Sequence, residues 1–219
     1  MTKIYNRGES SEVVAVRDAS LRIDSGDLLA IRGPSGSGKT TLLSLIGLLT
    51  RPTRGKIFID DQEISSYSDA WQTRVRREKV GFIFQQHNLL SQFSVWENVS
   101  LPLLYRDKGV GERRKTALLV LDRLGLGSRS DFKTAQLSVG EQQRVAIARA
   151  LVTDPEILLA DEPTASVDIE TAAHILDIFK HLKGSGKTII AVSHDPALVS
   201  EASAMVELRS GALVQSRRT

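Results

Sequence analysis

The chain has 219 residues and a mass of 24.0 kDa, which suits one domain or one domain with a large insertion. Charged residues make up 25% and apolar residues 41%, so disordered, collagen-like and coiled-coil proteins have little support. The net charge is only +3, from 29 Lys and Arg against 26 Asp and Glu. Charge alone therefore gives no argument for a nucleic-acid partner.

Cysteine is missing from the sequence, which excludes disulfides, zinc fingers, iron–sulfur clusters and cysteine nucleophiles. The apolar stretch 42–49 is interrupted by Ser44 and Gly47 and is shorter than the roughly 18 residues that a membrane-spanning helix needs. Residues 1–11 are polar and lack the apolar core of a secretory signal. We expect no membrane span and a chain that stays in the compartment where it is made.

Two kinds of strand pattern occur along the chain. Apolar and polar residues mostly alternate over residues 12–24 and again over 55–59, which predicts half-buried strands in a small antiparallel layer. Short continuous apolar runs indicate strands covered on both faces of a parallel sheet. These runs are residues 28–31, 157–160 and 189–192. The predicted fold class is therefore α/β.

Helices are predicted at residues 40–49, 141–152 and 169–183, the last with Asp168 as its N-cap. The stretch 85–152 contains no convincing parallel strand and is interpreted as a helical insertion into a core made of residues 1–84 and 153–219. Near the C-terminus, apolar residues flank Ser210 and Gly211, a pattern typical of a tight hairpin.

A glycine-rich loop follows the first buried run and precedes an apolar helix. It matches the pattern G-x-x-x-x-G-K-[ST], in which backbone N–H groups surround phosphate, Lys39 supplies positive charge and the Thr40 hydroxyl binds Mg²⁺. The alternative, a plain Gly/Ser-rich turn, is disfavoured by the flanking strand and helix. The predicted phosphate-binding residues are Gly33, Ser35, Gly36, Ser37, Gly38, Lys39, Thr40 and Thr41.

The letters GSGKT occur a second time, at residues 184–188. Here His181 stands where the first glycine of the motif is required, and the segment precedes a strand instead of following one. We interpret this second copy as a loop that ends a helix.

Charged side chains follow two of the buried runs, at the sheet edge where α/β proteins bind ligands. Asp161 is predicted to hold Mg²⁺, Glu162 to polarise an attacking water and His194 to sense the γ-phosphate. In the alternatives, the carboxylates are exposed turn residues before Pro163, and His194 closes a strand before a helix that starts at residues 195–196.

Residues 137–151 form an amphipathic helix with Ser138 and Glu141 spaced as a capping box. Capping alone explains this spacing. The helix N-terminus, with Ser138 and the Gly140 N–H group, is equally suited to an anion, and both interpretations stay open.

Together these segments resemble the ATP-binding subunit of an ABC transporter, over nearly the whole chain. In family order they are the Walker A loop (33–41), the Q-loop (84–86), the signature (137–151), Walker B with its glutamate (157–163), the D-loop (166–168) and the switch histidine (193–194). The resemblance implies a P-loop NTPase of the RecA-like type, with a parallel-sheet core, an antiparallel β layer and an inserted helical subdomain.

The resemblance also implies the ligands ATP and Mg²⁺ and gives roles to individual residues. Glu162, His194 and Gln85 would be catalytic, and Thr40, Gln85 and Asp161 would hold the metal. Tyr5 would stack on adenine, although it is alternatively a surface aromatic. Two copies would pair head to tail, so that Ser138 and Gly140 of one complete the ATP site over Lys39 of the other, and Asp168 of the D-loop would also bind nucleotide. Val139 and Glu141 replace the usual signature glycine and glutamine.

Within the family, residues 47–103 are similar to the lipoprotein-release, macrolide-export and cell-division ATPases. This similarity implies a transmembrane permease subunit as partner and a peripheral place at the cytoplasmic face of the inner membrane. The alternative is a regulatory ATPase that controls an extracytoplasmic enzyme without moving a solute. ABC ATPases of DNA or ribosomes carry long coiled-coil insertions, tandem cassettes or a basic tail, so no nucleic-acid partner is expected.

Overall fold

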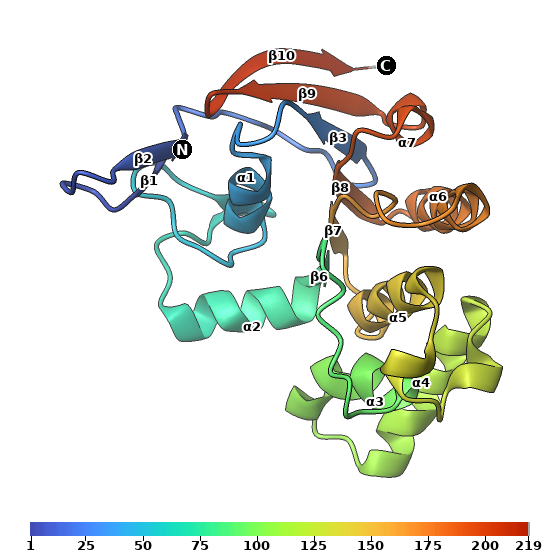
Figure 1. Ribbon diagram of the computed structural model, residues 1–219. Helices are drawn as coiled ribbons and strands as arrows, with labels where there is room; N and C mark the ends of the chain where they lie inside the picture. Colours follow the sequence, from blue (N-terminus) through green and yellow to red (C-terminus); the bar gives the residue numbers. More distant parts are fainter. Residues whose placement is uncertain (219) are drawn as a thin grey trace.

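The computed structural model describes residues 1–218, and the side chains of residues 1–214 (Figure 1). Its centre is a six-stranded sheet in the order β10-β9-β3-β8-β7-β6, parallel except for the β9–β10 pair. The strands are β3 (Leu28–Arg32), β6 (Val80–Ile83), β7 (Ile157–Asp161), β8 (Thr188–Val192), β9 (Ala204–Arg209) and β10 (Ala212–Arg218). The three predicted buried runs are β3, β7 and β8, which confirms the parallel α/β core.

Helices cover both faces of this sheet (Figure 1). Leu29 and Ile31 of β3 pack with the apolar residues of α1 (Lys39–Ile46), whereas Leu28 and Ala30 face α6 (Ile169–Gly184). The period-2 alternation thus divides one continuous apolar run between two cores. α7 (Pro196–Ser200), capped by Asp195, follows β8, so the helix start named in the alternative interpretation of His194 is present.

The antiparallel layer is smaller than expected. β1 (Lys3–Tyr5) pairs with β2 (Val13–Val16), and β4 (Phe58–Ile59) pairs with β5 (Gln62–Glu63) as a separate sheet. The prediction of strand over residues 19–24 is wrong. Their burial alternates at first, with Ala19 buried and Ser20 exposed, and Ala19 bonds to the backbone of Met1. Residues 19–24 nevertheless belong to none of the sheets of the described chain.

Besides the short strands β1 and β5, two elements have no counterpart in the sequence-based prediction, β6 and α2 (Asp69–Lys79). Gly81 interrupts the apolar run of β6. A Cβ at this position would lie 2.4 Å from the Ala150 carbonyl oxygen, so close packing against the helix that contains Ala150 requires glycine. α2 buries only Gln72 and therefore lacks an apolar stripe. Both elements depend on packing that the local pattern does not encode.

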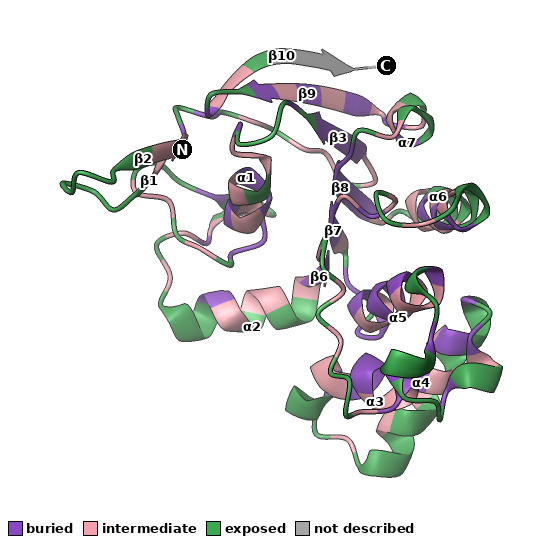
Figure 2. Cartoon of the chain, in the orientation of Figure 1, coloured by how far each residue is buried: buried purple, intermediate pink, exposed green. Residues whose placement is uncertain are grey.

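A helical subdomain lies between β6 and β7, as predicted (Figure 1). Its helices are α3 (Val95–Ser100), η1 (Leu101–Tyr105), α4 (Val110–Arg123), η2 (Gly127–Arg129), η3 (Thr134–Gln136) and α5 (Val139–Leu151). α5 is buried over much of its length (Figure 2), because it packs on β6 as well as on α3 and α4. It therefore joins the subdomain to the sheet.

The predicted C-terminal hairpin is confirmed. β9 and β10 are joined by the two-residue turn Ser210–Gly211, with φ angles of 47° and 81°. Two positive φ values in a two-residue loop match the twist of the flanking strands. The turn lies beside β2, because the Arg17 N–H group donates a hydrogen bond of 2.7 Å to the Gly211 carbonyl oxygen.

Candidate functional site

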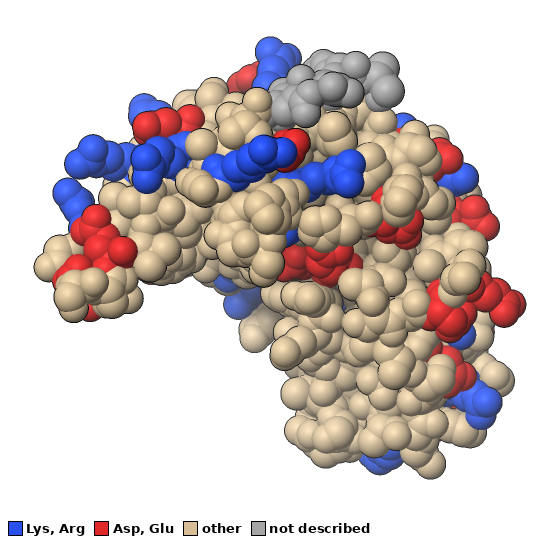
Figure 3. Space-filling view, turned by 45° about the horizontal axis from the view of Figure 1, so that its top comes forward, with Lys and Arg blue, Asp and Glu red and all other residues tan. Residues whose placement is uncertain are grey.

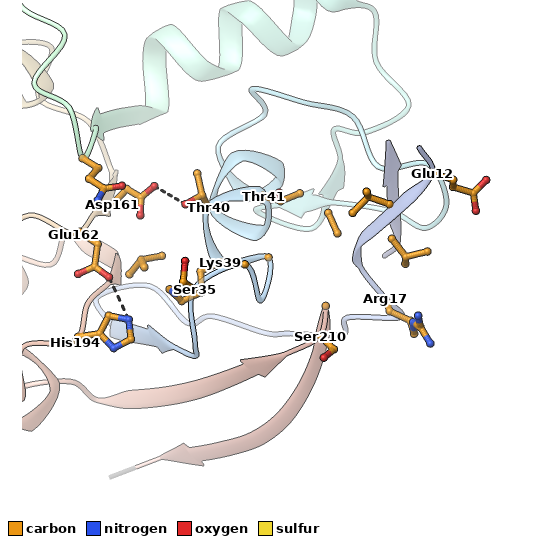
Figure 4. Close-up of a pocket in the computed structure, with 18 residues that line it drawn as sticks. Glu12, Arg17, Ser35, Lys39, Thr40, Thr41, Asp161, Glu162, His194 and Ser210 are labelled. Carbon is orange, nitrogen blue, oxygen red and sulfur yellow. Dashed lines mark hydrogen bonds and ion pairs between the residues drawn. The ribbon is translucent and has the colours of Figure 1, made fainter. Parts of the chain in front are cut away.

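A pocket of about 710 Å³ opens at the carboxyl ends of β3, β7 and β8 (Figure 4). The carboxyl edge of a parallel sheet is where loops and helix N-termini converge on ligands. The predicted site residues that line it are Ser35, Gly36, Gly38, Lys39, Thr40, Thr41, Gln85, Asp161, Glu162 and His194. Residues from four distant segments thus meet in one cavity.

The glycine-rich loop forms the floor next to α1. Gly36 and Gly38 have φ angles of 75° and 101°, in the left-handed region that glycine adopts without strain. A Cβ on Gly38 would lie 2.0 Å from the Ala15 carbonyl oxygen. α1 begins without a side-chain cap, so the N–H groups of its first turn remain open to an anion.

The Lys39 ammonium folds back over the loop. Its Nζ donates hydrogen bonds of 2.8 Å to the Gly33 carbonyl oxygen and 3.1 Å to that of Pro34. These two acceptors hold a positive charge beside the open N–H groups. A triphosphate is the kind of ligand that fits this combination of charge and backbone donors.

Asp161 lies at the end of β7 and is buried. Burial raises the pKa of its carboxyl, and the hydrogen bond from Thr40 and the positive charge of Lys39 oppose this shift. The Thr40 hydroxyl donates to Asp161 Oδ2 over 2.8 Å. Together with the amide oxygen of Gln85, this hydroxyl and carboxylate are the hard oxygen ligands that suit Mg²⁺.

Glu162 faces His194 across the pocket rim (Figure 4). The distance from Glu162 Oε1 to His194 Nε2 is 3.5 Å, and the Glu162 side chain is 15% exposed against 54% for His194. Glu162 has φ = 49°, a left-handed conformation that is costly for a residue with a Cβ. Its N–H group donates to the Val192 carbonyl oxygen over 2.9 Å, which ties it to β8.

Some predicted residues lie outside the pocket. Gly33 and Ser37 belong to the glycine-rich loop but do not line the cavity; the Ser37 Oγ is buried, and no partner for it occurs among the described residues. Tyr5 is also not a lining residue, although it pairs with Val13, which is. Its ring has the Lys3 ammonium 4.9 Å from its centre. The adenine role of Tyr5 stays a prediction.

Ser138 and Gly140 of the signature also do not line the pocket of their own chain. The capping box is formed: Ser138 Oγ accepts from the Glu141 N–H group at 3.2 Å, and Glu141 accepts from the Ser138 N–H group at 2.9 Å. Asp168 caps α6 by accepting from the Thr171 N–H group at 2.9 Å, as predicted. A Cβ on Gly140 would lie 2.8 Å from Thr171 Oγ1, so the two helix N-termini touch. An anion-binding role for Ser138 and Gly140 stays a prediction.

One wall of the pocket was missed by the sequence analysis. It consists of Glu12, Val13, Val14, Ala15 and Arg17 in or beside β2, with Ser210 and Gly211 of the hairpin turn. The hairpin was predicted from its turn residues, but no local pattern places it against β2. The second GSGKT segment, by contrast, lies away from the pocket, after α6, and Lys187 pairs there with Asp154 at 2.7 Å.

Residues 16–165 match the family model described as ABC transporter. The chain belongs to the ABC transporter family. It is an ATP-hydrolysing cassette of this family with the P-loop NTPase fold.

Similar proteins agree with this family. An uncharacterized ABC transporter ATP-binding protein of Thermotoga maritima is 45% identical over 95% of this chain and 89% of its own length. A macrolide export ATP-binding/permease protein, MacB of Hyphomonas neptunium, is 44% identical over 98% of this chain, which spans only 33% of that protein. A dimeric structure of the ATP-binding cassette MJ0796 in a post-hydrolysis state, bound to ADP and Pi, is 40% identical, with a TM-score of 0.92 and coverage of 99% of this chain and 95% of that one.

The described part of this ABC ATPase contains no helix that is long and apolar enough to cross a membrane.

Proposed function

We propose that this ABC ATPase powers a membrane-embedded transporter of the lipoprotein-release or macrolide-export type. The observation that carries the proposal is the convergence of Lys39, Thr40, Asp161, Glu162 and His194 on one pocket. These groups supply the charge, metal ligands and base that phosphoryl transfer to water requires. The similarity to MacB, whose name includes a permease, supports the coupling to a membrane partner.

The predicted site residues have separate roles in the proposed hydrolysis. Lys39 and the N–H groups of the glycine-rich loop bind and orient the β- and γ-phosphates. Thr40, Asp161 and Gln85 hold Mg²⁺, which neutralises charge on the phosphate oxygens when it is bound. Glu162 accepts a hydrogen bond from the attacking water and polarises it, and His194, beside Glu162, donates to the γ-phosphate. Tyr5 stacks on adenine beside Val13.

We further propose a head-to-tail homodimer that closes around ATP. Ser138, Gly140 and Asp168 lie outside their own pocket, so they meet nucleotide only if a second copy presents them. On the face seen in Figure 3, the lower lobe shows a broad area without Lys, Arg, Asp or Glu, while Lys and Arg gather in a band over the upper lobe. Depletion of charge is typical of the central part of protein interfaces. The dimeric MJ0796 cassette supports dimerisation.

The proposed partner is a transmembrane permease subunit, which places the ATPase peripherally at the cytoplasmic face of the inner membrane. MacB relatives carry such a permease in the same chain, since this chain spans about a third of their length. The regulatory alternative has the same ATP chemistry and a different membrane partner. Detergent pull-down of the membrane subunit discriminates the two: a transport permease supports the first proposal, and a partner dedicated to an extracytoplasmic enzyme supports the second.

The catalytic proposal is tested with Glu162→Gln. This variant should lose ATP hydrolysis while it still binds ATP, so that a dimer accumulates on size-exclusion chromatography when Mg²⁺ and ATP are present. Lys39→Ala should lose both hydrolysis and the ATP-dependent dimer. Full turnover in either variant would overturn the assignment.

A further inference from the structure

A buried glutamine of the signature helix reaches the segment that carries Glu162. Gln143 lies on α5 and is 3% exposed. Its Nε2 donates a hydrogen bond of 2.8 Å to the carbonyl oxygen of Pro163, the residue directly after Glu162. Because this bond is shielded from water, its loss leaves a buried carbonyl unsatisfied.

The bond matters because the backbone of Glu162 is strained. Its φ of 49° is a conformation that persists only when the surrounding structure holds it. On one side, the Glu162 N–H group is bonded to Val192 in β8. Pro163 has no N–H group of its own. On the other side, the Glu162 carbonyl oxygen accepts a 3.3 Å bond from the Ala165 N–H group within the same turn, and the bond from Gln143 to the Pro163 carbonyl oxygen ties this turn to α5.

The same helix also holds the segment after Gln85. Arg149 of α5 donates from Nη2 to the His87 carbonyl oxygen and from Nη1 to the Asn88 carbonyl oxygen, both at 2.6 Å. The His87 side chain is linked to Gln143 as well: burial lowers its pKa, and hydrogen bonding to Gln143 opposes this shift. α5 therefore contacts both the Gln85 segment and the Glu162 segment.

We propose that Gln143 is a positioning residue, which holds Glu162 in its strained conformation and aligns its carboxylate in the pocket. Gln143 acts through the backbone and does not touch nucleotide. The inference rests on the proposed role of Glu162 as the residue that polarises water.

Hydrogen exchange of the nucleotide-free chain tests the positioning itself. In Gln143→Met, which keeps the side-chain length and removes the amide, residues 161–168 should exchange about tenfold faster than in the parent chain, the effect of losing about one hydrogen bond. Gln72→Met is the matched control. Gln72 is also buried, at 4% exposure, and donates to three backbone carbonyls, but on the other side of the fold. Gln72→Met should leave hydrogen exchange at residues 161–168 unchanged.

Kinetics separate positioning from a general loss of structure. Gln143→Met should lower kcat about tenfold and leave KM for MgATP within about twofold, because nucleotide contacts are retained. Gln72→Met should lower the unfolding temperature without this loss of kcat. In a Glu162→Gln background, Gln143→Met should not lower the residual rate of hydrolysis further, since it acts through a carboxylate that is already gone.

Three results would overturn the proposal: unchanged exchange at 161–168, an equal loss of kcat in Gln72→Met, or additive losses in the double variant. If Gln143→Met does not fold, Gln143→Leu repeats the measurement, and failure of both to fold would show that the residue serves the fold and not Glu162. A parent chain without ATPase activity would contradict the proposed function alone, because the exchange experiment needs no nucleotide.

Discussion

The Thr40 hydroxyl donates a hydrogen bond to Asp161 Oδ2 over 2.8 Å, although 121 positions separate the two residues in the chain (Figure 4). Thr40 is in the first turn of α1 and Asp161 ends β7, so the bond joins the helix after the phosphate-binding loop to a strand that β8 separates from β3 in the sheet. It also opposes the rise that burial causes in the pKa of Asp161.

Thr40→Val should remove this bond while it keeps the shape of the side chain. Loss of a proposed Mg²⁺ ligand should lower MgATP hydrolysis by at least about 100-fold, because metal stabilisation of the transition state contributes several kcal/mol. ATP binding measured in EDTA should change little. Thr40→Ser, which keeps the hydroxyl, is the control and should retain activity within about tenfold; equal losses in both variants would contradict the metal role.

The duplicated GSGKT sequence provides an internal comparison. Lys39→Ala should abolish ATP binding, whereas Lys187→Ala should leave binding and hydrolysis unchanged, because Lys187 pairs with Asp154 outside the pocket. Asp154 is strongly exposed, so loss of this ion pair should cost about 0–1 kcal/mol in the free energy of unfolding. Nucleotide titration and urea unfolding of both variants check the two expectations. Impaired nucleotide binding by Lys187→Ala would refute the interpretation of the second segment.

Gly140→Ala tests the contact between the N-termini of α5 and α6. Alanine normally stabilises a helix by about 0.5–1 kcal/mol relative to glycine. Here the new Cβ would lie 2.8 Å from Thr171 Oγ1, so we expect a net destabilisation of about 1–3 kcal/mol. Gly111→Ala in α4 is the matched control, because nothing lies within 4 Å of its added Cβ. A stabilised Gly140→Ala variant would show that the two helices can separate at no cost.

Glu97 should make stability depend on pH. It completes the capping box of α3, and hydrogen bonds from the Ser94 N–H group and hydroxyl lower its pKa from the ordinary 4.5. Because the folded-state pKa is depressed, the stabilisation is present above about pH 4.5 and is lost as pH falls through the folded value.

Glu97→Gln, which keeps the capping geometry without the charge, should be less stable than the parent by about 0.3–1 kcal/mol at neutral pH. The difference should vanish in acid. Urea unfolding of both proteins between pH 7 and pH 3 measures it, and a difference that grows in acid would contradict the assigned direction.

Much of the fold could be predicted, because the strongest patterns are short and repeat a single period. β3, β7 and β8 are continuous apolar runs that only a doubly covered sheet can bury. Residues 19–24 show why alternation alone is insufficient: a strand also needs a ladder that continues along it, and although Ala19 bonds to the backbone of Met1, residues 19–24 belong to none of the sheets of the described chain. β6 and α2 were missed because Gly81 and a mostly polar helix surface hide their role in packing.

The amino-acid sequence by itself determined which groups we expect to carry the chemistry. The glycine-rich loop, the carboxylates after β7 and the histidine after β8 are recognisable because each motif depends on hydrogen bonds and backbone geometry within a few residues.

Only the tertiary structure decided which distant segments line the pocket and which hydrogen bonds fix its residues in place. The bond from Gln143 to Pro163 joins residues 20 positions apart, and the bond from Thr40 to Asp161 joins residues 121 positions apart. The pocket wall at β2 brings residues 12–17 together with the hairpin turn at 210–211. Such contacts arise from the packing of whole elements against one another, and the local pattern around either partner does not specify them.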